Sequence, residues 1–258
     1  MVLGTLAGML SGMLGIGGGT VVGPVLVLAG LPLLRASGTA LAMIAPVSLA
    51  GVATEGFVSF EHLDPGLAAV LGFGGVLGVV LARKAALHLP ELLLRRLFAL
   101  LLFATALRQF GVFGVAAIEH VGWFGDNGTM RLILAIGLGL FAGCSAILFG
   151  VGGGIVMVPG MVFAVGGLSI HEATAVSLLA MVPTAAYGGY AAWRDGRVDT
   201  SILKPLMGSA MVGVAAGVLV RNFLLAPPVL SIAFGCFLLF VTASLLRRPV
   251  AAGAARLP

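Results

Sequence analysis

The chain has 258 residues, of which 60% are hydrophobic and 9% are charged, and its formal net charge is +5. Soluble domains carry roughly a quarter of charged residues, so this composition excludes a soluble enzyme or binding module and indicates an integral membrane protein. The positive charge does not indicate nucleic acid, because the basic residues form short clusters between apolar runs, as membrane topology requires.

Two similar sets of apolar segments follow one another along the chain, and most have about the 17 to 25 residues that span a bilayer. In the first set, a run at about 2–34 precedes segments at 37–60, 65–82 and 92–107. In the second, a run at about 132–168 precedes segments at 173–193, 201–220 and 227–246. We therefore expect a first transmembrane repeat at 1–108, a connecting loop at 109–131, a second repeat at 132–248 and a cytoplasmic tail at 249–258.

The first run of each set is interrupted by the motif G-x-G-G-G, which a proline follows five residues later. The motif occupies 15–19 and again 150–154, and the prolines are Pro24 and Pro159. One offset of 135 residues relates both the motifs and the prolines, since 150 − 15 and 159 − 24 agree. This agreement indicates that one structural unit was duplicated.

The clustered glycines predict that each apolar run is broken into two half-helices joined by an unwound tip. Glycine loses the most backbone freedom in a helix and tolerates positive φ, so four glycines within five positions interrupt helical structure. Opened backbone at membrane depth is tolerated only where protein buries it or where it lines a wet cavity. Because duplicated broken segments mark the binding sites of secondary transporters, the two tips predict a transport site.

The basic residues indicate whether the broken runs cross the membrane. If each run enters and leaves on one side, eleven basic residues share a side and only Arg108, Arg131 and Arg221 lie opposite. If each run crosses the membrane, five basic residues lie on one side and nine on the other, without a clear cluster. The positive-inside rule favours the first arrangement and puts both termini in the cytoplasm. The sequence thus predicts an all-α integral membrane protein with two inverted repeats, each a broken re-entrant helical hairpin plus three transmembrane helices.

The glycine tips are the predicted binding site for a small anion. Each tip precedes the N-terminus of a half-helix, where free N–H groups and the positive end of the helix dipole favour negative charge. The predicted substrate-binding residues are Gly17, Gly18, Gly19 and Thr20 at the first tip, Gly152, Gly153 and Gly154 at the second, and Ser11, Cys144 and Ser145 beside them. The alternative is that the glycines serve only close helix packing and that Cys144 is a small core residue.

Several other polar residues in or near the apolar segments have two interpretations each. Thr39 and Thr174 stand at matching positions, and they either cap the helices that follow or, if those helices begin beside the tips, bind the anion. Glu55 lies within an apolar segment near its outer end, where it is either a proton-coupling group or a charge at headgroup level. His62 and His171 are expected in outer loops near the membrane interface.

The duplicated motif also carries a family resemblance. The stretch GIGGGTVVGPVLVLAG with SGTALA downstream, and its repeat GVGGGIVMVPGMVFAVGG with ATAVSLLA, resemble the TauE/SafE sulfite-exporter family of multi-pass bacterial transporters. The resemblance covers nearly the whole chain. It implies export or uptake of a small sulfur-containing anion, such as sulfite or an organosulfonate, across the cytoplasmic (inner) membrane, and it does not specify the substrate.

Two functional classes remain open at this stage. The first is a secondary transporter, an exporter that works by alternating access, and the second is an anion channel that uses the same glycine tips as a filter. A membrane enzyme is disfavoured, because no cluster of His, Asp, Cys and Ser stands at membrane depth. The expected partners are the anionic substrate and the lipid bilayer, without nucleic acid, cofactor or metal, and a homodimer is the candidate assembly.

Overall fold

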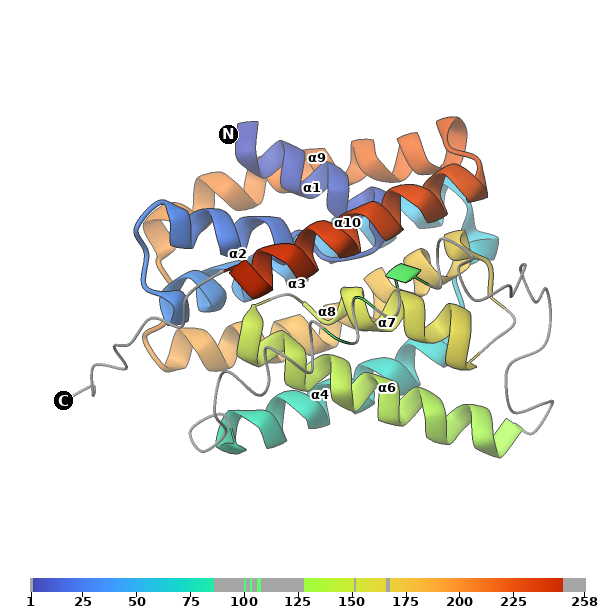
Figure 1. Cartoon of the computed structure of the whole chain (residues 1–258), viewed down its shortest axis with the longest axis horizontal. Helices are drawn as coiled ribbons and strands as arrows, with labels where there is room; N and C mark the ends of the chain where they lie inside the picture. The colour runs from blue at the N-terminus through green and yellow to red at the C-terminus, as the bar shows by residue number, and fades with distance from the viewer. Residues whose placement is uncertain are drawn as a thin grey trace.

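A computed structural model of the chain describes residues 2–85, 100, 103, 106–107, 128–150, 152–165 and 168–247. Within these ranges the regular structure is entirely helical (Figure 1). The longer helices are α1 (Val2–Leu14), α2 (Gly19–Leu28), α3 (Leu33–Val58), α4 (Pro65–Ala85), α6 (Gly128–Phe149), α8 (Ile170–Arg194), α9 (Thr200–Leu224) and α10 (Pro227–Arg247). The shorter ones are η1 (Phe60–His62), α7 (Gly154–Gly160) and the π-helical η2 (Met161–Val165).

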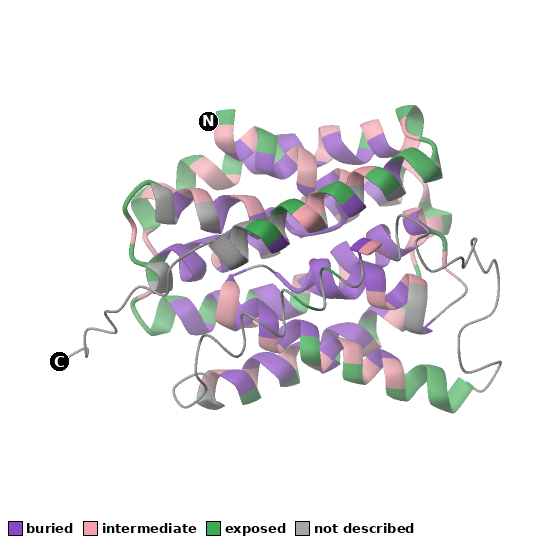
Figure 2. Cartoon of the chain, viewed as in Figure 1, coloured by how far each residue is buried: buried purple, intermediate pink, exposed green. Residues whose placement is uncertain are grey.

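The prediction of an all-helical membrane protein is confirmed. Five of the described helices, α3, α4, α6, α8 and α9, are long and apolar enough to cross a membrane. At 1.5 Å per residue, a helix of about 20 residues matches the hydrocarbon thickness of roughly 30 Å. Figure 2 shows buried residues along the middle of the bundle and exposed residues on its outside. The exposed side chains include large apolar ones such as Phe57, Phe73 and Phe223. The predicted segment at 92–107 lies almost wholly outside the described residues.

Both predicted breaks occur at the glycine motifs. Helix α1 ends at Leu14 and α2 begins at Gly19, while α6 ends at Phe149 and α7 begins at Gly154. In Figure 1 the chain folds back after each break, so that α2 returns toward the end at which α1 begins and α7 toward the end at which α6 begins. The arms are unequal, because α1 has 13 residues and α6 has 22. The expectation that both first arms are half-helices is therefore wrong for α6, which is as long as a membrane span.

The strongest helix packing joins one half of the sequence to the other. Helix α1 packs along α9, α4 packs along α6, and α3 and α8 form a central pair. Glycines bring these helices into backbone contact: a Cβ atom at Gly8 would lie 2.1 Å from the carbonyl oxygen of Ala210, and one at Gly143 would lie 1.9 Å from that of Gly75. Small residues at such positions are the usual basis of helix association in lipid. The two halves are consequently interlocked, and both tips lie inside the bundle.

One end of the bundle carries a cluster of charges. Asp195, directly after α8, forms ion pairs with Arg83 at the end of α4 and with Arg197, the latter at 2.8 Å. Partial burial raises the pKa of Asp195, but hydrogen bonds from Arg197 and Arg83 outweigh this effect and lower it below the ordinary value of 3.8. Asp195 therefore stays ionised at neutral pH and links the ends of α4 and α8. In Figure 1, α1 begins and α10 ends toward this same side.

Candidate anion site at the glycine tips

The two tips have the same backbone conformation at matching positions. The values of φ are +66°, +72° and +68° at Gly15, Gly17 and Gly18, and +68°, +78° and +79° at Gly150, Gly152 and Gly153. A side chain is rarely compatible with this left-handed conformation, so these positions require glycine. The first, third and fourth residues of G-x-G-G-G are thus fixed by the turn itself.

The tips lie against each other inside the bundle. A Cβ atom at Gly19 would lie 2.5 Å from the carbonyl oxygen of Gly150, and one at Gly154 would lie 2.3 Å from that of Gly15. The structure therefore brings together the glycines of both motifs, which are more than a hundred residues apart in the sequence. The same glycines also provide the close packing that was the alternative interpretation, so their proximity alone does not decide between packing and binding.

Two apolar side chains from the central helices cover the tips. A Cβ atom at Gly17 would lie 2.8 Å from Cγ2 of Ile44 on α3 and 3.0 Å from Sδ of Met181 on α8. One at Gly152 would lie 2.7 Å from Cδ1 of Ile44. Both covering side chains are fully buried. Sequence reasoning did not single out either residue, because an apolar residue in an apolar helix carries no local signal of its role.

Two of the predicted hydroxyls lie buried beside the first tip without a hydrogen-bond partner. Ser11 and Thr20 are 0% and 4% exposed, and no partner is present for either hydroxyl oxygen among the described residues. Cβ of Ser11 lies 3.6 Å from the position that a Cβ atom of Gly18 would take. Leaving a buried polar group unsatisfied costs about 1 to 3 kcal/mol. A buried water or a bound ligand is expected to supply the missing partner of each hydroxyl.

The second tip is less polar. At the offset of 135 residues, the counterparts of Ser11 and Thr20 are Ala146 and Ile155. The nearby Ser145 donates its hydroxyl hydrogen bond to the carbonyl oxygen of Ala142 at 2.8 Å, within its own helix. The thiol of Cys144 donates to the carbonyl oxygen of Gly78 on α4 at 3.4 Å. Unlike Ser11 and Thr20, Ser145 and Cys144 are therefore already engaged.

The helix-capping interpretation of Thr39 and Thr174 is wrong. Helix α3 begins at Leu33, well before Thr39, and α8 is capped by Ser169 in a capping box with Glu172. The Thr39 hydroxyl instead accepts a hydrogen bond from the backbone N–H of Asp199 at 2.9 Å. The reason is that both helices extend further toward their N-termini than the apolar pattern indicates. The Thr39 hydroxyl therefore joins α3 to the start of α9.

Thr174 touches the first tip through its backbone. Its Cα atom lies 2.8 Å from the position that a Cβ atom of Gly15 would take. Its hydroxyl donates to the carbonyl oxygen of His171 at 2.7 Å and accepts from Nη1 of Arg221 at 2.8 Å. From the same helix, the hydroxyl of Ser177 donates to the carbonyl oxygen of Gly15 at 2.9 Å. Helix α8 thus holds the first tip in position.

Glu55 is buried in an ion pair inside the bundle. Its carboxylate and the guanidinium of Arg221 on α9 are both 0% exposed and paired. The carboxylate also accepts from Nδ2 of Asn222 at 3.1 Å and lies 3.0 Å from Nδ1 of His62. His62 in turn stacks obliquely against His171, with 5.9 Å between ring centroids. Glu55 is therefore a buried, paired acid, and whether it takes part in proton coupling stays a prediction.

Arg221 connects this ion pair to the first tip. Its Nη1 donates to the carbonyl oxygen of Gly12 on α1 at 3.1 Å, one helical turn before the tip, and to the hydroxyl of Thr174. Sequence reasoning counted Arg221 only as an outer-side charge. The sequence did contain a signal for this pair. Glu55 and Arg221 each stand inside an apolar segment near the same predicted membrane face, and charges within a membrane generally pair with one another.

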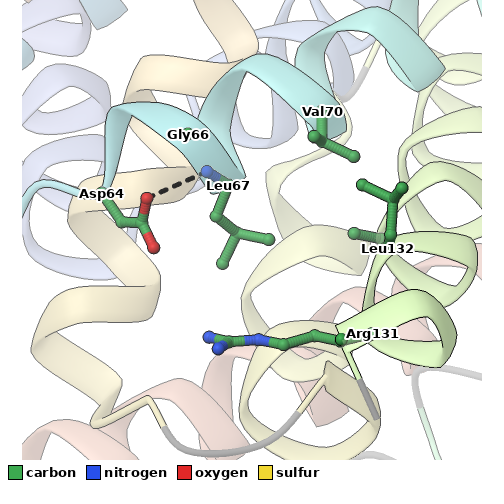
Figure 3. Close-up of a pocket in the computed structure, with 8 residues that line it drawn as sticks. Asp64, Gly66, Leu67, Val70, Arg131 and Leu132 are labelled. Carbon is green, nitrogen blue, oxygen red and sulfur yellow. Dashed lines mark hydrogen bonds between the residues drawn. The ribbon is translucent and has the colours of Figure 1, made fainter.

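A separate pocket of about 230 Å³ lies between the first turns of α4 and α6. Figure 3 shows the carboxylate of Asp64 accepting from the backbone N–H of Leu67, at 2.9 Å, and the guanidinium of Arg131 extending below Leu67. The other wall is apolar and includes Val70 and Leu132. This pocket lies at the outer helix ends, and the full length of α6 separates it from the second tip.

Comparison with known proteins agrees with the membrane architecture. The family described as "Sulfite exporter TauE/SafE" matches residues 1–109 and 135–257, which include both glycine motifs. A probable membrane transporter protein of Bacillus subtilis (strain 168), YdhB, is 26% identical over 220 residues, covering 85% of this chain and 88% of the relative. No solved structure matches the chain. With both halves matched, the chain belongs to the TauE/SafE sulfite exporter family of membrane transporters.

Proposed function

We propose that this protein is a secondary transporter, an exporter, that moves a small sulfur-containing anion such as sulfite or an organosulfonate across the inner membrane. We place the anion at the first glycine tip, where the second tip packs against it. The observation that carries this proposal is the pair of buried, unpartnered hydroxyls of Ser11 and Thr20 beside Gly18. Membership of a sulfite exporter family supports the substrate class.

The chemistry of the first tip suits an oxyanion. The tip leads directly into α2, whose N-terminus carries a partial positive charge of roughly half an elementary charge. The absent side chains at Gly17 and Gly18 let an anion approach the backbone N–H groups closely. Sulfite and sulfonate oxygens accept hydrogen bonds, and the hydroxyls of Ser11 and Thr20 are donors without an acceptor in the part of the chain that the structure describes. Binding would therefore provide hydrogen-bond partners for the anion oxygens and for the two hydroxyls together.

The covering side chains favour a carrier over a channel. Ile44 and Met181 are fully buried against the glycines, and the two tips are in backbone contact. An anion then reaches the site only when these contacts open, as a conformational cycle requires. We propose that the matched halves move relative to each other as inverted repeats, with the charged end at Arg83 and Asp195, and hence both termini, in the cytoplasm.

The proposal is tested by sulfite flux in proteoliposomes. In the Ser11→Ala/Thr20→Val double variant we expect the KM for sulfite to rise by on the order of tenfold or more, because donor groups to a charged ligand are lost. The matched control is Ser145→Ala, whose hydroxyl is engaged within α6 and whose loss leaves KM unchanged. A Gly18→Val variant is less informative, since a φ of +68° strains any side chain. An unchanged KM in the double variant contradicts the site, and single-channel currents contradict the carrier.

A further inference from the structure

A continuous line of polar groups leads from the surface to the first tip. His62 is 24% exposed and its Nδ1 lies 3.0 Å from the buried carboxylate of Glu55. Glu55 pairs with Arg221, and Arg221 reaches the carbonyl oxygen of Gly12 at 3.1 Å, one turn before the tip. Nothing in the proposed anion site itself requires a buried acid, so the position of Glu55 calls for a separate explanation.

We propose that Glu55 couples anion binding to proton binding, with His62 as its proton donor and Arg221 as the charge that the bound anion balances. This inference rests on the proposed function and adds the coupling ion to it. Proton and anion are bound together and released together, so they move across the membrane in the same direction, and in export Glu55 gives its proton back through His62 when the anion is released.

The charges of Glu55, Arg221 and the anion must balance because the site is buried. With Glu55 ionised, its charge cancels that of Arg221, and an arriving anion adds an uncompensated negative charge. With Glu55 protonated and no anion, Arg221 is left as an uncompensated positive charge. Either state alone is costly inside a protein, where isolated charges are poorly solvated. A proton on Glu55 together with an anion at the tip keeps the site neutral, so each ligand strengthens the binding of the other.

The proton route uses the two nitrogens of one histidine. In neutral His62 with a hydrogen on Nδ1, that hydrogen is donated to the Glu55 carboxylate. Nε2, which has no hydrogen-bond partner among the described residues, can then accept a proton from water. When Nε2 takes up a proton, the Nδ1 proton passes to Glu55. His62 is again neutral, now with its hydrogen on Nε2, and one proton has moved from water to the buried carboxyl group.

The groups around Glu55 fit this assignment. Among the described residues, the titratable or charged groups that face it are Arg221 from α9, His62 from η1 and His171 from α8. Helix α1 contains no titratable side chain and contributes the carbonyl oxygen of Gly12. The Nε2 atom of His171 lies 3.3 Å from the backbone carbonyl oxygen of Arg221 and is therefore engaged there. His62 is thus the neighbour placed to pass a proton to Glu55.

The test measures binding of methanesulfonate to the detergent-solubilised protein by calorimetry between about pH 5 and pH 8, the range in which histidine ordinarily titrates. Methanesulfonate is used because its own charge does not change there, whereas that of sulfite does. A unit charge at a distance of about 10 Å changes the affinity for an anion by on the order of tenfold. We expect wild-type binding to tighten by about that factor at acidic pH. Buffers of different ionisation enthalpy then report proton uptake on binding.

Variants separate coupling from a structural role. Glu55→Gln is expected to bind at every pH as tightly as the wild type does at acidic pH, without proton uptake. Glu61→Gln is the matched control, because Glu61 lies in the adjoining η1 but is exposed, and it should keep the wild-type pH dependence. If Glu55→Gln does not fold, the absence of proton uptake by the wild type still overturns the coupling. His62→Gln should slow the pH response of flux and leave equilibrium binding intact.

The outcomes distinguish the two proposals. Anion binding without proton uptake, or an unchanged pH dependence in Glu55→Gln, overturns proton coupling and leaves the anion site standing. Absence of binding of both methanesulfonate and sulfite at every pH overturns the anion site, and the coupling falls with it. Proton uptake that survives in Glu55→Gln assigns the coupling group elsewhere and overturns the role of Glu55.

Discussion

Arg221 brings a positive charge into the middle of an apolar bundle. Its guanidinium is fully buried, and its hydrogen bonds reach three other helices through Glu55 on α3, Gly12 on α1 and Thr174 on α8. Such a pair contributes little net stability, because desolvation offsets most of the attraction between the charges. In addition to the charge that it supplies in the proposed coupling, Arg221 fixes how the end of α9 meets the first tip.

We expect Arg221→Met to lower the free energy of unfolding by about 3 to 5 kcal/mol, because Glu55 is then buried without a counter-charge. The Glu55→Gln/Arg221→Met double variant should recover most of that loss, since neither charge remains. Denaturant titration in detergent micelles measures both. Additive losses in the double variant would mean that the two side chains act independently, contrary to the observed ion pair.

Among the helices, α6 shows why glycine is required at some positions and not at others. Gly143 faces α4 so closely that an added Cβ atom would lie 1.9 Å from a backbone oxygen of Gly75. Gly137, nearly two turns earlier, is exposed and has no atom within 4 Å of that position. Gly143 therefore sets the distance between α4 and α6. Gly137 has no such role and only lowers the intrinsic helix stability of α6.

Two alanine variants therefore separate the effect of helix packing on stability from that of helix propensity. They are Gly143→Ala and Gly137→Ala. Gly143→Ala should destabilise the protein by more than about 1 kcal/mol, because a backbone atom cannot move aside without separating α4 from α6. Gly137→Ala should be neutral or stabilise it by up to about 1 kcal/mol, since alanine favours helix. Thermal unfolding in detergent compares them. A similar loss in both variants would indicate that the α4 and α6 contact is looser than the structure shows.

At the scale of the whole molecule, the described helices of each half pack mainly against helices of the other half and not into a bundle of their own. Helix α1 of the first half packs along α9 of the second, α4 packs along α6, and the two tips complete each other at the centre. This interlocking differs from two domains that meet across a hinge. It keeps the two glycine tips in register, because each tip rests on a helix of the opposite half: Gly15 on Thr174 and Gly150 on Ser37.

Split chains test this arrangement. We expect the fragments 1–108 and 128–258, expressed separately, to aggregate or be degraded. Each fragment alone exposes the helix-packing surfaces that the other half covers in the whole protein. Co-expressed, the two pieces should assemble, co-purify through a tag on one piece and restore sulfite flux. Stable, folded accumulation of either piece alone would contradict the interlocked packing.

The sequence by itself determined the membrane class, the breaks in the helices and the positions of the tips. These properties depend on local physics: apolar length fixes what can lie in lipid, and the turn at Gly15, Gly17 and Gly18 needs positive φ, which glycine alone adopts readily. The duplication could be recognised in the sequence for the same reason, because each copy of the motif needs the same glycines at the same spacing. Ser11 and Thr20 were identified because they stand next to that turn in the chain.

Only the tertiary structure decided which groups the tips meet. Glu55 and Arg221 are 166 positions apart, and Ile44 and Met181 reach the glycines from two different helices. Hydropathy gives the length of a helix but not the face it turns toward a neighbour, so Thr39 and Thr174 looked like caps and Arg221 like a surface charge. These partnerships arise from the packing of α3, α8 and α9, where burial makes each unpaired charge or hydroxyl costly enough to select its partner.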